Sequence, residues 1–320
     1  MTDRPADVQG ISLNPIERTI AGDSINYTNI TVEIDRATRT ANINILAPTT
    51  APPADADGIH ALGDQFWSLR MARELDDAIL HLRTNENEIG TWLFQTSGDA
   101  ALVAAHDATL AANQDHWLVR EITLFLKRVF KRIDVTSRSI FAIIEPASCF
   151  TGTLLELALA ADRSYMLDGQ FEGDNRPVAM ISLTAMNFGP YEMVNGLTRL
   201  QSRYLNDPAT VEALRKRQGE AMDALTAEEA GLITFAPDDI DWEDEIRIAV
   251  EERAAFSPDA LTGMEANLRF GGQETMESKI FSRLSAWQNW IFQRPNAVGE
   301  FGALPLYGSG QRSEFDKRRA

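Results

Sequence analysis

The segment from Ile140 to Asp162 constrains the fold of this chain more than any other part of it. It reads IFAIIEPASCFTGTLLELALAAD: a short apolar run that ends at Pro146, then, after Gly152, a helical pattern with leucines on all sides. A short apolar run bounded by turn residues predicts a buried strand, and a helix that is apolar all round has no face for water. We therefore predict a buried strand, a sharp turn and a buried helix.

Glu156 is an acidic residue in the first turn of that apolar helix. Burial among apolar neighbours would raise its pKa toward the range of a general acid or base. Thr153 and Glu156 also have the spacing of a capping box, in which the two side chains bond unpaired backbone N–H groups of the first turn. The spacing alone leaves both hypotheses open, a catalytic carboxylate and a cap.

The composition is that of a globular protein with a substantial core. Of 320 residues, 44% are hydrophobic and 24% are charged, which is close to the average for soluble domains. No segment approaches the ~18 to 20 apolar residues that span a bilayer, so we expect no membrane helix. The first ten residues, MTDRPADVQG, have no apolar signal core, which predicts a cytoplasmic protein.

The net charge of -17 argues against a nucleic-acid partner, because phosphate binding needs clustered basic residues. One basic cluster, from Lys127 to Arg132, is typical of the solvent-exposed face of an amphipathic helix. Cys149 is the only cysteine, and the four histidines show no metal-ligand spacing. We predict no disulfide within the chain and no metal. A lone cysteine next to Phe150 is typical of a small buried hydrophobe.

The order of the elements predicts an α/β architecture. Residues 1–26 have no sustained periodicity and are interpreted as a leading arm or linker. Residues 27–34 and 40–46 alternate as in a β-hairpin, and residues 61–82 have the apolar spacing of a helix. Gly90 and Thr91 then begin the strand WLFQT. Hairpin, helix and strand together indicate a parallel βαβ unit.

Helical patterns dominate the rest of the chain. They are expected at residues 99–112, 117–133, 211–217, 227–232, 242–256, 258–270 and 274–292. The last of these carries an aromatic and aliphatic stripe that includes Phe281, Leu284, Trp287 and Trp290. Such a stripe is more typical of a core or a subunit interface than of a ligand site.

Three segments resemble the crotonase (enoyl-CoA hydratase/isomerase) superfamily: GTWLFQTSGDAALVAAHDATL, IIEPASCFTGTLLELALAAD and LTAEEAGLITFAPDDID. The resemblance implies a crotonase-like ββα superhelix core over residues 27–240 and a C-terminal helical region over residues 241–320. Three phrases, SCFTGTLLELALAADRSYML, SPDALTGMEANLRFGG and RLSAWQNWIFQRPNAVGE, are similar to one lyase group within it. These lyases open the ring of an oxygenated benzoyl-CoA with release of formate in aerobic benzoate degradation. They fuse two crotonase-like modules, and the chain resembles the second.

The resemblance also implies a site. The thioester oxygen of an acyl-CoA substrate would accept hydrogen bonds from the backbone N–H groups of His106 and Thr153, which together stabilise an enolate. Glu156 matches the first catalytic glutamate of the superfamily, and Ser148 and Cys149 are candidate substrate contacts. Two departures stand out. Gly152-Thr153-Leu154 replaces a Gly-Gly-Gly turn, and a second glutamate expected near Thr184 or Ala185 is missing.

Three functions remain as hypotheses. The chain is the ring-opening lyase or its second module, a non-catalytic module that supports a separate catalytic half, or an enoyl-CoA hydratase/isomerase. The lyase reaction would use water and no redox cofactor, since the CoA is part of the substrate. The resemblance implies an oligomer or pairing with a second crotonase-like module. It assigns no residue to the CoA phosphates.

Overall fold

A seven-stranded sheet forms the centre of the molecule in a computed structural model that describes residues 10–318. The strands follow one another in chain order across the sheet; β1 to β4 pair antiparallel, and β4 to β7 pair parallel. They are β1 Thr19–Ala21, β2 Ser24–Asn26, β3 Ile30–Asp35, β4 Thr40–Leu46, β5 Thr91–Ser97, β6 Ser139–Ile144 and β7 Arg163–Met166. The predicted hairpin and the parallel pairing of β4 with β5 are confirmed.

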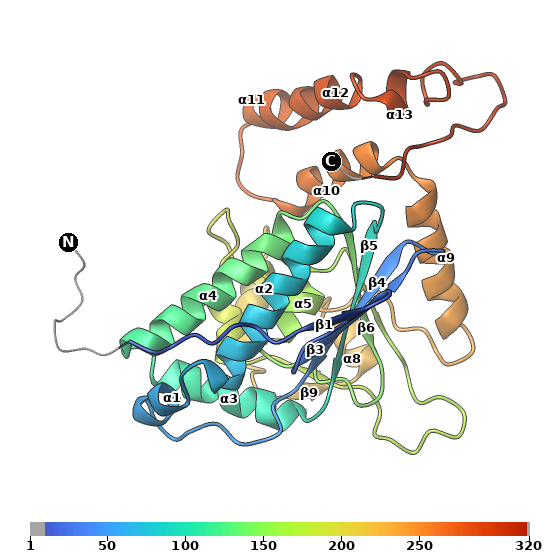
Figure 1. Cartoon of the computed structure of the whole chain (residues 1–320). Helices are drawn as coiled ribbons and strands as arrows, with labels where there is room; N and C mark the ends of the chain where they lie inside the picture. The colour runs from blue at the N-terminus through green and yellow to red at the C-terminus, as the bar shows by residue number, and fades with distance from the viewer. Residues whose placement is uncertain (1–9, 319–320) are drawn as a thin grey trace.

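Both faces of the parallel strands are buried. Successive side chains of a strand point to opposite faces. Trp92 and Phe94 of β5 therefore join the large core, whereas Leu93 joins a smaller one. The helices α2 (Trp67–Asn85) and α4 (Trp117–Asp134) lie side by side over the first face, and α9 (Trp242–Ala255) covers part of the second (Figure 1). Parallel sheets are normally covered in this way, which explains the almost wholly apolar sequence of β6.

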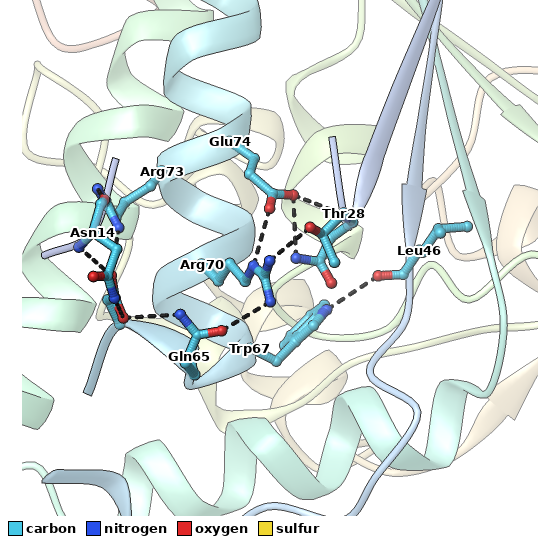
Figure 2. A network of polar contacts seen from close by, with 10 residues as sticks. Asn14, Thr28, Leu46, Gln65, Trp67, Arg70, Arg73 and Glu74 are labelled. Atoms are coloured by element: carbon cyan, nitrogen blue, oxygen red, sulfur yellow. Dashed lines mark hydrogen bonds and ion pairs between the residues drawn. The ribbon is translucent and has the colours of Figure 1, made fainter. Parts of the chain in front are cut away.

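Polar contacts hold the segment before β1 to α2 and to Asp64, which lies just before that helix. The backbone N–H of Asn14 donates to Asp64 at 2.6 Å, and Arg73 Nη2 donates to the Asn14 carbonyl at 2.6 Å. Figure 2 shows this network together with the ion pair between Arg70 and Glu74 on the next turn of the helix. Residues 19–26, which the sequence pattern assigned to the arm, form β1 and β2 of the sheet.

Shorter elements connect and flank the sheet. In the core region they are α1 Ala56–Leu62, η1 Gly63–Gln65, α3 Ala100–Ala112, α5 Leu155–Ala160, β8 Ile181–Ser182, η2 Ala185–Phe188, α6 Arg199–Arg203, α7 Pro208–Arg215, β9 Ala221–Met222 and α8 Ala224–Glu229. The C-terminal region contains α10 Pro258–Arg269, α11 Met276–Ser278, the π-helical turn η3 Lys279–Ser285, α12 Ala286–Ile291 and α13 Pro295–Val298. No helix among residues 10–318 is long and apolar enough to cross a membrane.

The C-terminal helices lie outside the main core. Figure 1 shows α11, α12 and α13 beyond α10, on the side away from the sheet. Phe281 and Leu284 are 72% and 59% exposed, so the hypothesis that their stripe is core is wrong for these two residues. Both residues lie on η3, and no other part of residues 10–318 covers their side chains.

Candidate functional site

The turn between β6 and α5 is held by its own polar groups. Glu145 N–H donates to Ser148 Oγ at 3.0 Å, and Cys149 N–H donates to Thr96 Oγ1 of β5 at 2.9 Å. Ser148 lines a cavity of about 410 Å³ and so can reach a ligand there. Cys149 cannot, because its side chain is fully buried and burial raises the pKa of its thiol to about 11. Of the two candidate substrate contacts, the structure leaves only Ser148 accessible.

After this turn, the backbone N–H of Thr153 is bonded to a side chain of the same chain. It donates to Asp107 Oδ2 at 2.8 Å, and the Thr153 hydroxyl donates to the other oxygen of that carboxylate. The Thr184 hydroxyl donates to Asp107 Oδ2 as well, at 2.7 Å. Asp107 belongs to α3 and is 2% exposed. A carboxylate thus lies where the resemblance places a substrate oxygen.

Gly152 makes this close approach possible. Its φ of +47° is left-handed, and a Cβ built on it would lie 1.8 Å from Asp107 Oδ2 and 2.4 Å from Thr184 Oγ1. Glycine has no Cβ, so it tolerates both the conformation and the contact. The first glycine of the turn is therefore required here by the carboxylate, independently of any ligand.

The pKa of the buried Asp107 carboxyl group is higher than usual for an aspartate. Burial raises its pKa to about 6, because the charged form loses its hydration, and the nearby charge of Glu156 acts in the same direction. The hydrogen bonds from Thr153 and Thr184 partly oppose this. The carboxyl group therefore holds its proton to a higher pH than an ordinary aspartate does.

Glu156 takes part in a second buried network. Its carboxylate accepts from Asn187 Nδ2 at 2.7 Å and from Arg199 Nη1 at 2.7 Å. Arg199 Nη2 also bonds both oxygens of Asp134, at 2.8 and 2.7 Å. All four residues are at most 4% exposed. Burial raises the pKa of Glu156, although the charge of Arg199 opposes the shift.

These contacts correct the capping hypothesis. The helix α5 begins at Leu155 with Leu154 as its N-cap, and no side chain bonds the cap. The Thr153 hydroxyl bonds Asp107, and the Glu156 carboxylate bonds Asn187 and Arg199. A capping box does form at Thr184, whose partner is Asn187. The position where a second glutamate was expected thus starts a short helix.

His106 does not present its backbone N–H to an open site. It lies in the interior of α3, where the N–H of a residue bonds the carbonyl four positions earlier. Its ring stacks on Phe66 at 5.2 Å between centroids, and burial lowers the pKa of the imidazole. In this structure, the amides of His106 and Thr153 therefore do not form an open pair of donors, which the predicted oxyanion hole requires.

Three residues of these networks, Asp107, Asn187 and Arg199, were not predicted from the sequence. Asp107 carried a usable signal, since Val103, Asp107 and Leu110 follow the i, i+4, i+7 spacing of one helical face and all three are buried. An acid on an apolar face implies a partner elsewhere. Arg199 lies in the mixed sequence TRLQSR, where no such pattern singles it out. Among residues 10–318, no cluster of His, Cys, Asp or Glu side chains has a metal-binding arrangement.

Known structures share this architecture, although no family model matches the chain. An enoyl-CoA hydratase from Bacillus anthracis superposes with a TM-score of 0.61 at 16% identity, over 91% of this chain and 100% of that one. An enoyl-CoA hydratase/isomerase from Marinobacter aquaeolei gives 0.60 at 18% identity, over 89% and 98%. The chain therefore has the crotonase fold, as the sequence predicted, with an α/β core and a C-terminal helical extension.

Sequence similarity is more specific than the fold. The chain is 54% identical over 318 residues to the benzoyl-CoA-dihydrodiol lyase of Aromatoleum evansii. The match covers 99% of this chain but 56% of that enzyme, so the chain spans about half the length of this relative. The predicted resemblance to a benzoyl-CoA-dihydrodiol lyase is confirmed at the level of sequence.

Proposed function

We propose that the chain is a crotonase-fold module of a benzoyl-CoA-dihydrodiol lyase. The observation that carries the proposal is the 54% identity over nearly the whole chain. The substrate would be an oxygenated benzoyl-CoA, opened with release of formate, and the reaction would use water and no redox cofactor. We place the module in the cytoplasm, without a nucleic-acid partner, paired with a second crotonase-like module or a further copy.

A second proposal concerns the role of this module within the lyase. Stabilising a thioester enolate needs N–H donors that are free to meet the developing charge. The Thr153 N–H is bonded to Asp107, and Glu156 is bonded to Arg199 inside the core. A substrate oxygen would have to displace a buried carboxylate. These contacts favour the hypothesis that the module supports a catalytic partner without binding the reacting atoms.

An assay of formate release distinguishes the two roles. The chain, a full-length lyase of the same type and the part of that lyase outside the match are each supplied with 2,3-epoxybenzoyl-CoA, alone and mixed. A supporting module gives no formate by itself and raises turnover or stability of the other part. Turnover by this chain alone, lost in Glu156→Gln while the fold persists, would contradict the supporting role. Failure of every combination to release formate would overturn the lyase proposal itself.

Two controls make the result specific. Glu212→Gln removes an exposed carboxylate of α7, which is 65% exposed and pairs only with Arg215 among the described residues, so it should leave turnover unchanged. Hydration of crotonyl-CoA tests the third hypothesis, an enoyl-CoA hydratase. That reaction normally needs two carboxylates, and Thr184 and Ala185 supply none at the second position. We therefore expect no hydration.

A further inference from the structure

A cavity lined by four arginines lies where the sheet core meets the C-terminal helices. Its volume is about 280 Å³, and Arg199 and Arg203 of α6, Arg253 of α9 and Arg269 of α10 contribute to its wall. The end of α5, at residues 159–162, forms another part. Thr153 precedes the opposite end of that helix, so Asp107 does not line this cavity, although Arg199 and Asp134 of the Glu156 network do.

The carboxylates of the cavity already have partners. Asp134 bonds Arg199 through both oxygens, and Asp162 bonds Arg269 at 2.8 Å. Glu265 accepts from the Ser139 hydroxyl at 2.7 Å. The negative charges of the wall are therefore engaged with the protein, and their bonds are directed to groups other than Arg203 and Arg253.

Two of the four arginines are not paired with a carboxylate of the described residues. Arg203 and Arg253 are half-buried, and neither pairs with a carboxylate within residues 10–318. Arg203 donates to the Gly231 carbonyl, at 2.8 Å, and burial lowers the pKa of its guanidinium. The Arg253 Nη1 atom is buried, and it has no hydrogen-bond partner in the same part of the chain.

A second buried donor without a partner belongs to Arg199. Its Nε is buried without a partner in the described chain, although its two other nitrogens bond Glu156 and Asp134. Arg199 is 3% exposed, and it lines the same cavity as Arg203 and Arg253. Burying a charged donor without a partner is costly, and native proteins normally provide one. Two guanidinium groups with an unpartnered buried nitrogen, beside a third arginine that pairs with no carboxylate among the described residues, are the expected surroundings of a bound anion.

We propose that this cavity binds a small oxyanion, a phosphate or a carboxylate, between Arg199, Arg203 and Arg253. Guanidinium groups match such oxygens in charge and geometry. The volume is that of about nine waters, which leaves room for an ion of this size with part of its hydration. The proposal does not depend on the lyase function.

Isothermal titration calorimetry of the purified chain tests the proposal. Inorganic phosphate and acetate are titrated separately, against sodium chloride at the same ionic strength. Saturable binding of one ion per chain, with a rise in melting temperature, is expected for at least one of them, because a ligand that binds only the folded state stabilises it. Phosphate alone would indicate a tetrahedral ligand, and acetate a carboxylate. Absence of saturable binding for both would overturn the proposal.

Substitutions locate the ion. Arg203→Gln and Arg253→Gln should each weaken binding about tenfold, the usual effect of losing one hydrogen bond to a charged group. Arg247→Gln is the matched control, since it removes an arginine of the same helix, α9, that is 54% exposed and paired with Asp244 and Glu251. Unchanged affinity in both test variants would place the ion elsewhere and contradict the proposal. Arg253→Lys keeps the charge if a neutral variant folds poorly.

Discussion

Asp107 should make the stability of the protein depend on pH in an unusual direction. Its pKa is about 6 in the folded state and has an ordinary value of 3.8. A raised folded pKa means that the stabilising contribution is present below about pH 4 and is lost as the pH rises through about 6. The whole difference corresponds to about 3 kcal/mol. Asp107→Asn cannot ionise, so its stability relative to the wild type should increase from about pH 4 to about pH 8.

Urea unfolding of both proteins at several pH values measures this difference. The amide oxygen of the asparagine variant would still accept from the Thr153 N–H, so the fold should persist. A matched variant is Asp99→Asn, which changes the acid that caps the same helix, α3, at its exposed start. A difference between Asp107→Asn and the wild type that stays constant over this range would contradict the assignment.

Glu156 and Arg199 should differ in how much the fold depends on them. Glu156→Gln leaves Arg199 paired with both oxygens of Asp134, so the loss is one charged hydrogen bond, about 2 kcal/mol. Arg199→Met leaves Glu156 and Asp134 buried without a cation, which should cost about 3–5 kcal/mol. Chemical denaturation gives both values. Equal losses would mean that Arg199 is not what holds the two buried carboxylates together.

The bonding partners of the buried side chains could not be predicted from the sequence. Periodicity and apolar neighbours identify Glu156 and Cys149 as buried, and both are. They do not identify what lies opposite, because Arg199 is 43 positions from Glu156 and Asp107 is 46 positions from Thr153. The side chains that decide the chemistry meet only through the tertiary fold.

The turn before α5 needs a glycine at position 152. Gly152→Ala would force a Cβ against Asp107 and Thr184 in a left-handed conformation. We expect a loss of about 3 kcal/mol or more in unfolding free energy, since both overpacking and backbone strain contribute. Gly169→Ala is the control, because its φ is also left-handed, +92°, but no atom lies within 4 Å of a built Cβ. Equal losses would show that the close contact carries no cost.

Elements with strong patterns were predictable. The strand β6 and the helix α4 were found because apolar runs and amphipathic spacing depend on the local sequence. The strands β1 and β2 were missed because each has three residues, and β1 is exposed throughout. Such strands form because β3 offers an edge to pair with, which their own sequence does not reveal.

For the whole molecule, the exposed side of the C-terminal helices predicts association. Contiguous apolar surface on a soluble protein usually contacts a partner. Phe281→Glu with Leu284→Glu should lower the sedimentation coefficient at high protein concentration and leave the melting temperature nearly unchanged. Gln288→Glu with Asn289→Glu adds the same charge at exposed polar positions and is the control. Identical sedimentation of all three proteins would show that this surface binds no second copy.

Because Cys149 is buried, its reaction with an alkylating reagent can measure local unfolding around it. A thiol that is fully buried, with a pKa of about 11, reacts with alkylating reagents only after β5 and the turn at residues 145–149 have separated. As no other cysteine competes, the rate of modification at about pH 8 should follow how often the centre of the molecule comes apart. Rapid labelling of the native protein would show that β5 and this turn separate often under native conditions.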